Sequence, residues 1–555
     1  MRIPLAFAAA LSMVLAACAP SAAPAGASPV ATTAAAPTGA ALPTAEQPRP
    51  GGELVYIVTA EPPTFDGHQS TTFATLMPVS PHYSLLYRLD PADNVSKIVP
   101  DVADGMPQIS ADKLTWTVKL RKDVKFHDGS ALTAEDVVAT YEKIRKPPTG
   151  VTSPRQATLA PVESVTAQGA DTVVFKLKYP SASFQAALAS PWNYLYQASK
   201  LKTDPKYYEK NVMGTGPFTY TEYVKGSHWA GKKNPGYFVQ GKPYLDSYKA
   251  VFITDVNRQT TAIQSKQAMI EFRGFTPTQR DTLSRALPND LAIQEAPWVC
   301  VNYVSFNTTK KPFDDARVRR ALTMAIDRWK GGEALSRQTI VKDVGGLMRP
   351  KGPFAMTDAE LEKIPGFARD NAKSVEDAKK LLADAGASNL TFNFLNRNVT
   401  TPYEPVALFV INEWKKIGVN ATHQVKETAP YQADLRNKNF DVGLDFNCDY
   451  FDEPDLQLAK FYSASGLGAG LNLSHYEDKK LDGMIDAQSR ETDPQKRKQL
   501  VGEIERYAMG EQAWMVPVIW WYRIIPHLNA VRGYRIGSNH YTNMDMANVW
   551  LATSR

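Results

Sequence analysis

The chain has 555 residues, of which 43% are hydrophobic and 22% are charged, and its formal net charge at pH 7 is +6. This composition is close to that of soluble globular proteins and excludes a collagen, a long coiled coil and a wholly disordered chain. Three cysteines exclude a disulfide-dense scaffold. The basic residues are too weakly clustered for a nucleic-acid-binding surface, and the length leaves room for several buried cores.

The N-terminal residues have the pattern of an export signal. Arg2 precedes an apolar run over 3–17, which is shorter than the roughly 20 residues that span a bilayer and is typical of a secretory signal. The run ends in Leu-Ala-Ala-Cys18, which resembles a bacterial lipobox. We therefore predict that 1–17 is a signal peptide and that Cys18 is lipidated. An ordinary signal peptide with an incidental cysteine is the alternative.

Residues 18–50 are predicted to form a tether. After Cys18 the segment is almost entirely Ala, Pro, Thr, Ser and Gly up to Pro48, a composition that cannot build a packed core. No other stretch approaches 18 apolar residues, so we expect no transmembrane helix. A lipid, a tether and a folded body together predict an exported protein, periplasmic or at the cell surface, anchored to a membrane by its lipid.

The first half of the body shows strand patterns. An apolar run over 54–58 predicts a buried strand. Alternating apolar and polar residues over 114–120 and over 173–179 predict two more strands.

Helical patterns occur between and after these strands. Thr133, with Asp136 three residues later, predicts a helix N-terminus with a capping box. Apolar residues at helical spacing predict further helices over 318–326 and over 374–385, the last ending at Gly386. Mixed strands and helices without a fixed repeat indicate an α/β body.

The sequence contains no recognisable catalytic or metal-binding motif. Its eight histidines are scattered, without His-Glu-x-x-His or Cys-x-x-Cys. The glycine-rich stretch 466–470 lacks the Lys and Ser/Thr of a phosphate loop. His127 and Asp128 are interpreted as part of a structured turn. We expect no catalytic residue, no metal and no cofactor.

Six carboxylates gather between residues 441 and 455. They are Asp441, Asp445, Asp449, Asp452, Glu453 and Asp455. Paired carboxylates can serve glycoside hydrolysis, and acidic clusters can also bind a cation or a substrate amine, or simply hydrate a loop. The sequence leaves these alternatives open.

Several stretches, in the right order, resemble the family 5 extracellular solute-binding proteins, the receptors of bacterial ABC importers for peptides, opines, nickel and some oligosaccharides. The stretches are Lys119–Val138, Gly214–Phe218, Asn234–Phe238, Pro312–Arg328, Ala378–Gly386 and Asp452–Asp455. The resemblance spans residues 51 to about 550.

The resemblance implies an α/β, two-lobed periplasmic-binding-protein clamshell of type II with an extra subdomain and discontinuous lobes. Lobe I is expected to comprise 51–82, 212–298 and 515–555. The extra subdomain is expected over 83–211 and lobe II over 299–514. Such a receptor works as a monomer, closes over a small solute and delivers it to a membrane permease.

The resemblance also implies that Cys300 and Cys448 form a disulfide beside the pocket, the alternative being two separate thiols. In the peptide receptors an aspartate two residues after this cysteine binds the ligand's α-amine. Here Tyr450 stands at that position and Asp449 precedes it. A shifted loop would deliver Asp449 or Asp452 to an ammonium group, whereas Tyr450 would favour a sugar-like or opine-like ligand.

The candidate ligand contacts share a place near this cysteine pair or near the segments that contact ligand in the family. They are Phe73, Trp298, Tyr303, Asn447, Asp449, Tyr450, Asp452, Trp520 and Trp521. Trp520 and Trp521, if they lie on a strand, point to opposite faces, so at least one belongs to a core. The leading hypothesis is a receptor for a peptide or a peptide-like or opine-like solute. An oligosaccharide receptor on the same fold and a secreted glycoside hydrolase are the alternatives.

Overall fold

A computed structural model describes residues 46–91, 97–468, 470–539, 541 and 544–552. Residues 48–555 form one compact unit, separate from 1–47. Cys18, the predicted signal peptide and most of the predicted tether lie outside the described residues. Within the described ranges, no helix combines the length and the apolar character needed to cross a membrane.

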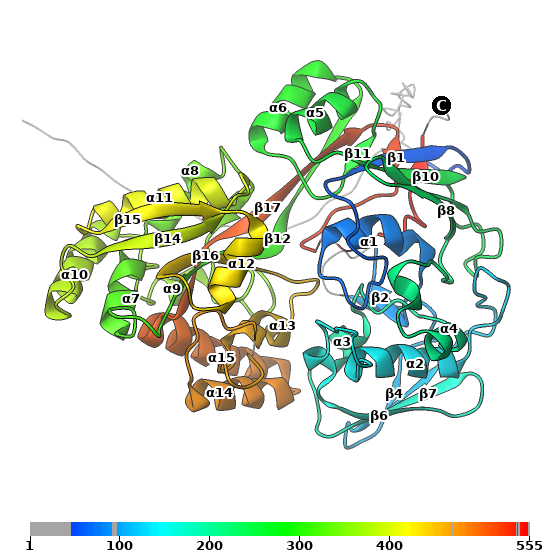
Figure 1. Cartoon of the computed structure of the whole chain (residues 1–555), viewed down its shortest axis with the longest axis horizontal. Helices are drawn as coiled ribbons and strands as arrows, with labels where there is room; N and C mark the ends of the chain where they lie inside the picture. The colour runs from blue at the N-terminus through cyan, green and yellow to red at the C-terminus, as the bar shows by residue number, and fades with distance from the viewer. Residues whose placement is uncertain (1–45, 92–96, 469, 540, 542–543, 553–555) are drawn as a thin grey trace, which may run out of the picture. The chain divides into compact units, whose positions relative to one another are not determined.

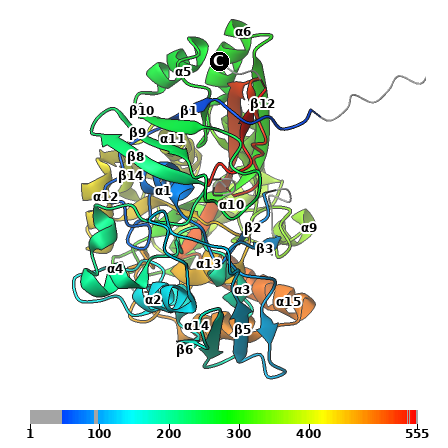
Figure 2. The same cartoon turned by 90° about the vertical axis from the view of Figure 1, so that its right-hand side faces the viewer.

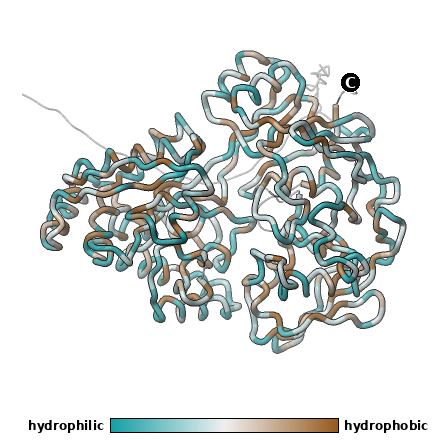
Figure 3. The backbone as a smooth tube through the Cα atoms, viewed as in Figure 1, coloured by the Kyte–Doolittle hydropathy of each residue, from teal (hydrophilic) through white to brown (hydrophobic). Residues whose placement is uncertain are grey.

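Eleven strands of the described residues form the main sheet, in the order β15-β14-β16-β12-β17-β11-β1-β10-β9-β8, with β13 beside β17. Their bounds are β1 Glu53–Val58, β8 Phe218–Val224, β9 His228–Lys233, β10 Ser247–Phe252, β11 Ile270–Glu271, β12 Leu291–Phe306, β13 Val341–Asp343, β14 Thr391–Arg397, β15 Asn420–Lys426, β16 Val442–Cys448 and β17 Met515–Leu528. Hydrophobic residues recur along these strands, while hydrophilic residues predominate on the outer helices and loops (Figure 3).

The long antiparallel strands β12 and β17 connect the two halves of the sheet (Figure 1). Their register shifts between Pro297 and Tyr303. Up to Trp521, β17 packs into the cores beside β14 and β16, and from Ile525 it packs into the core beside β1 and β10. The strand pair therefore passes from one core region to the other within a few residues, and the predicted lobe boundary at 515 falls at its N-terminal end.

A smaller sheet, ordered β4-β5-β7-β6, belongs to a third region. Its strands are β4 Gln108–Ile109, β5 Thr115–Lys119, β6 Val162–Ala167 and β7 Thr172–Leu177. These strands pack with α2 (Ala134–Arg145) around a core drawn from residues 86–195. This sheet and the helix pair α5 and α6 lie at opposite ends of the described body (Figures 1 and 2).

The remaining helices cover the sheets. They are α1 Phe73–Val79, α3 Phe184–Leu188, α4 Ala198–Thr203, α5 Val256–Gln264, α6 Pro277–Ala286, α7 Ala316–Met324, α8 Arg328–Leu335, α9 Asp358–Leu361, α10 Asn371–Asp384, α11 Tyr403–Lys415, α12 Thr428–Arg436, α13 Pro454–Leu458, α14 Lys479–Arg490 and α15 Pro494–Glu505. Short strand pairs β2 (Tyr87–Leu89) with β3 (Ile98–Pro100) and β18 (Val531–Arg532) with β19 (Trp550–Leu551) complete the structure.

The sequence predicts the type of these elements correctly and some of their ends less well. The three predicted strands are β1, β5 and β7, and the predicted capping box of Thr133 and Asp136 begins α2. The helix expected from residue 374 starts at Asn371, because the Asp370 side chain accepts a hydrogen bond from the Lys373 amide and caps the helix earlier. Gly386 follows it with a φ of 67°, a conformation that suits glycine.

Candidate ligand-binding site

A cavity of about 490 Å³ lies between the third region and the part of the body that holds β16. Residues 154–161 and 179–192 form one wall, and residues 431–436, 445–467 and 470–473 contribute to the other. Its volume falls within the roughly 300–1,000 Å³ of small-molecule sites. The cavity is therefore large enough to enclose a small solute between two separate walls.

One edge of β16 faces this cavity with its backbone. The Asp449 amide donates to the Val299 carbonyl at 3.0 Å, so Asp449 is hydrogen-bonded to β12. Successive residues of a strand direct their backbone N–H and C=O groups to opposite sides, and those of Phe446 and Cys448 therefore point away from β12. The Phe446 carbonyl indeed accepts from Lys460 Nζ at 2.8 Å on that opposite side. On the same side β14 pairs only with Val442 and Gly443. The Phe446 and Cys448 amides thus lie along a strand edge that β14 does not cover.

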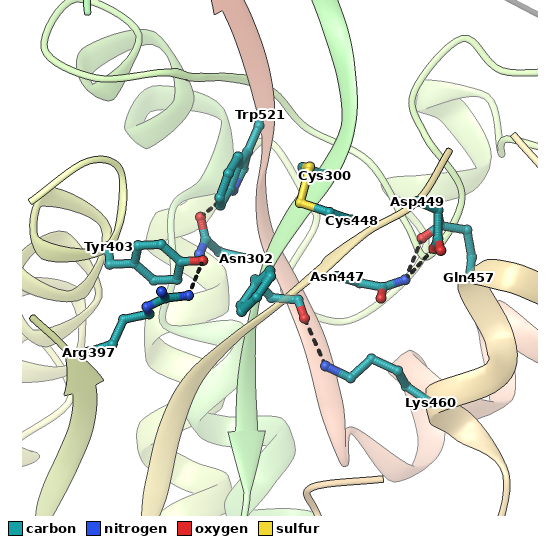
Figure 4. Close-up of a disulfide and its surroundings, with 11 residues drawn as sticks. Cys300, Asn302, Arg397, Tyr403, Asn447, Cys448, Asp449, Gln457, Lys460 and Trp521 are labelled. Atoms are coloured by element: carbon teal, nitrogen blue, oxygen red, sulfur yellow. Dashed lines mark hydrogen bonds between the residues drawn. A yellow bond between two sulfur atoms is a disulfide. The ribbon is translucent and has the colours of Figure 1, made fainter. Parts of the chain in front are cut away.

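The predicted disulfide is confirmed. Cys300 and Cys448 lie opposite each other on β12 and β16, with an S–S distance of 2.03 Å and a Cα–Cα distance of 4.1 Å. This spacing is that of a cross-strand pair without mutual backbone hydrogen bonds. The bond therefore fixes β16 to β12 at the position where Cys448 lines the cavity (Figure 4).

Asp449 is a half-buried carboxylate in the wall of this cavity. It accepts a hydrogen bond from Asn447 Nδ2 at 2.8 Å, and Asn447 also donates to Gln457 Oε1 at 3.0 Å (Figure 4). Burial raises the pKa of Asp449 to about 7, although the nearby Lys460 ammonium opposes the shift. Such a group can hold a proton or receive a ligand cation near neutral pH.

The other five carboxylates of the acidic cluster form ion pairs with four cations of the protein itself. The pairs are Asp441 with Lys310, Asp445 with Lys460, Asp452 with Arg349, and both Glu453 and Asp455 with Arg497. Within the part of the chain that the structure describes, Asp449 has no such ion pair. Asp445, Glu453 and Asp455 also line the cavity but are held in these ion pairs, so Asp449 is the cavity carboxylate of the described residues that lacks one.

Hydrogen bonds join the two cavity walls. The Tyr450 hydroxyl donates to the Ala186 carbonyl at 3.4 Å, and the Ser183 hydroxyl donates to the Asp455 carboxylate. The Ala182 amide donates to the Ser489 carbonyl at 3.0 Å. The structure thus has the two walls in direct contact beside the cavity.

Three of the nine predicted ligand contacts, Asn447, Asp449 and Tyr450, line the cavity. The other six, which are not among the cavity walls in the described residues, are Phe73, Trp298, Tyr303, Asp452, Trp520 and Trp521. Most of them make core contacts. As ligand contacts these residues stay predictions.

The tandem tryptophans show why a pattern alone does not place them. Trp520 donates to the Gly346 carbonyl at 3.0 Å on one face of β17, and Trp521 donates to Asn302 Oδ1 at 2.7 Å on the other. The predicted alternation is confirmed, and both rings are buried, in two different cores. Asp452 is likewise engaged, because Arg349 binds both of its oxygens.

Residues that sequence reasoning missed form the opposite wall. Arg155 donates to the carbonyls of Gly67, His68 and Ser70 at 2.8–2.9 Å, and its guanidinium lies 4.9 Å from the ring centroid of Trp192. Arg155 and Trp192 both line the cavity. They lie in loops without a periodic pattern or a motif, so nothing in the sequence marked them except the high aromatic content.

The described residues contain no group of three or more His, Cys, Asp or Glu side chains arranged to hold a metal ion. The chemistry of the cavity is that of its backbone edge, the Asp449 carboxylate and its aromatic and apolar walls.

Comparison with known proteins identifies relatives of the chain. Residues 97–469, more than half of the chain, match the family model described as "Bacterial extracellular solute-binding proteins, family 5 Middle". Oligopeptide-binding protein AppA of Bacillus subtilis (strain 168) is 29% identical over 469 residues, which are 80% of this chain and 82% of AppA.

Two solved structures share the fold at low sequence identity. DppA from Helicobacter pylori, in complex with the peptide STSA, has a TM-score of 0.77 at 22% identity. AgaA from A. tumefaciens R10, in complex with agropinic acid, has a TM-score of 0.77 at 21% identity. Each covers 91% of this chain and 99% of its own. The fold is therefore the predicted α/β, two-lobed clamshell of the type II periplasmic binding proteins.

Proposed function

The chain belongs to the bacterial extracellular solute-binding proteins of family 5, and on that premise we propose that it captures a short peptide or peptide-like solute for an ABC importer. The observation that carries the proposal is the edge of β16, with the Phe446 and Cys448 amides along it, beside the carboxylate of Asp449. A peptide main chain adds to such an edge as a further strand.

Asp449 supplies the matching electrostatics. An ammonium group that enters the cavity meets a carboxylate that forms no ion pair with a cation of the described residues. Charge-assisted hydrogen bonds of this kind are about twice as strong as neutral ones. A ligand with one free amine and a peptide-like backbone therefore satisfies both the strand edge and the carboxylate at once.

Capture requires that ligand binding and closure of the two walls are linked in one equilibrium. The bonds from Tyr450 to Ala186 and from Ser183 to Asp455 form only when the two walls meet. A ligand that contacts both walls stabilises that arrangement by its differential affinity for it. We propose that the permease recognises this closed form of a monomeric receptor.

Binding measurements test the proposal directly. Isothermal titration with free-amine di- and tripeptides is expected to give micromolar affinities, equivalent to about −8 kcal/mol, while neutral oligosaccharides give no heat of binding. Asp449→Asn is expected to weaken peptide binding. Asp441→Asn is the matched control, because Asp441 belongs to the same acidic cluster but does not line the cavity. Saturable oligosaccharide binding without peptide binding would overturn the proposal.

We further propose that the protein is exported and held at a membrane by a lipid on Cys18, which lies outside the described residues. The support is the lipobox-like sequence before Cys18 and the Ala- and Pro-rich tether after it. Metabolic labelling with a fatty acid is expected to mark the protein and to fail for Cys18→Ala. Labelling that survives this substitution would refute the anchor.

A further inference from the structure

We propose that the same cavity contains an apolar subsite, which selects ligands carrying a large aliphatic side chain. The subsite is formed by Tyr431, Leu435, Leu467, Leu471 and Leu473. The inference rests on the proposed function, because it concerns the ligand of the same cavity.

The first observation is the exposure of two leucines at this wall. Leu467 is 53% exposed and Leu471 is 40% exposed, although both line the cavity. A single exposed leucine on a protein surface needs no explanation. Two that line the same cavity offer apolar surface that an occupant of the cavity would remove from water.

The second observation is that the wall behind them is rigid. Tyr431 and Leu435 stand one helical turn apart on α12 and are buried in a small core with Phe440, against which Leu473 packs. The Tyr431 hydroxyl donates to the Leu444 carbonyl on β16 at 2.7 Å, which fixes the ring. The apolar surface is therefore supported by a packed cluster that is tied to the same strand that carries the free edge.

The third observation is the character of the facing wall. Across the cavity, residues 154–161 contribute the small or apolar side chains of Pro154, Ala157, Ala160 and Pro161. Arg155 of the same wall is held by three backbone carbonyls, so the small side chains beside it leave room for a bulky aliphatic group. All these residues border the same cavity as the free edge of β16. The occupant of the apolar space is therefore a side chain of the ligand that binds at that edge.

The subsite predicts a position-dependent preference. In apolar pockets one methylene group changes binding by about tenfold or more. We therefore expect one of the peptides Leu-Ala-Ala, Ala-Leu-Ala and Ala-Ala-Leu to bind at least about tenfold more tightly than Ala-Ala-Ala. The three peptides locate the subsite along the ligand, because only one position can reach it when the amine is held at Asp449.

Two variants connect this preference to the wall. Leu467→Ser with Leu471→Ser is expected to bring the ratio of leucine-peptide affinity to Ala-Ala-Ala affinity down to about one, and the double variant is expected to fold because both side chains are exposed. Leu408→Ser is the matched control, since Leu408 is 45% exposed on α11 and does not line the cavity.

The outcomes separate this inference from the proposed function. If Ala-Ala-Ala binds and no leucine peptide binds better, or if the preference survives in the double variant, the subsite is refuted and the receptor stands. If no free-amine peptide binds at all, the proposed function fails, and the inference fails with it.

Discussion

The protonation of Asp449 makes a quantitative prediction about ligand affinity. Burial raises the pKa of this carboxyl to about 7. The positive charge of Lys460 opposes the shift, and the negative charge of Asp452 adds to it. Because only the ionised form attracts an ammonium group, the competent fraction of the receptor changes near neutral pH. An α-amine has a pKa of about 7.7–8.0, so most of the free peptide stays charged below neutrality.

The magnitude follows from the fraction of ionised Asp449. That fraction is about three quarters near pH 7.5 and about one tenth near pH 6, and the apparent Kd rises as the inverse of the competent fraction. We expect peptide affinity to fall roughly sixfold between these two pH values, because about a third of the α-amines are already uncharged near pH 7.5. Removing the charge by Asp449→Asn is expected to weaken binding near pH 7.5 by about 2 kcal/mol, roughly thirtyfold, and to flatten the pH profile.

Titration calorimetry in buffers across this range measures the effect, and an N-acetylated copy of the same peptide is the ligand control. The acetylated peptide has no ammonium group, so its weak binding should not depend on pH in this window. If the wild-type protein and Asp449→Asn show the same pH dependence, the carboxylate does not bind the ligand's amine and the electrostatic reasoning is wrong.

Three predictions concern stability. Burial raises the pKa of Glu505 from its ordinary value of 4.5 to about 7, so between these pH values the native state binds a proton that the unfolded chain releases, and stability falls as pH rises. Urea denaturation of Glu505→Gln should show about 3 kcal/mol less of this fall than the wild-type protein. If the two proteins lose stability with pH in parallel, the prediction is refuted. Reducing the Cys300–Cys448 bond, which spans 148 residues, should cost about 2–4 kcal/mol in the same assay; an unchanged midpoint would contradict this. Arg349→Met should destabilise by about 3–5 kcal/mol because it leaves the Asp452 carboxylate buried without its cation; adding Asp452→Asn should recover much of that loss, and additive losses would refute the pairing.

The fold was more predictable from the sequence than the site. Alternation and helical spacing depend on neighbouring residues, so they identified β5, β7 and the capped start of α2 directly. The Cys300–Cys448 bond joins distant segments, and only the resemblance to a family indicated it.

The site combines segments that local patterns cannot bring together. Asn447, Asp449 and Tyr450 were predicted because they adjoin Cys448, whereas Arg155 and Trp192 enter from a region far away in the sequence. Aromatic residues pose a further difficulty, because the same ring suits a core and a cavity wall equally well.

The central claim is that the cavity beside β16 holds a peptide-like ligand, and native mass spectrometry of the protein purified without denaturation tests it most directly. We expect bound masses that resolve into short peptides or peptide-like amines, retained by the wild-type protein and by Asp441→Asn but depleted in Asp449→Asn. A retained series spaced by hexose units, equally bound by all three proteins, would contradict it.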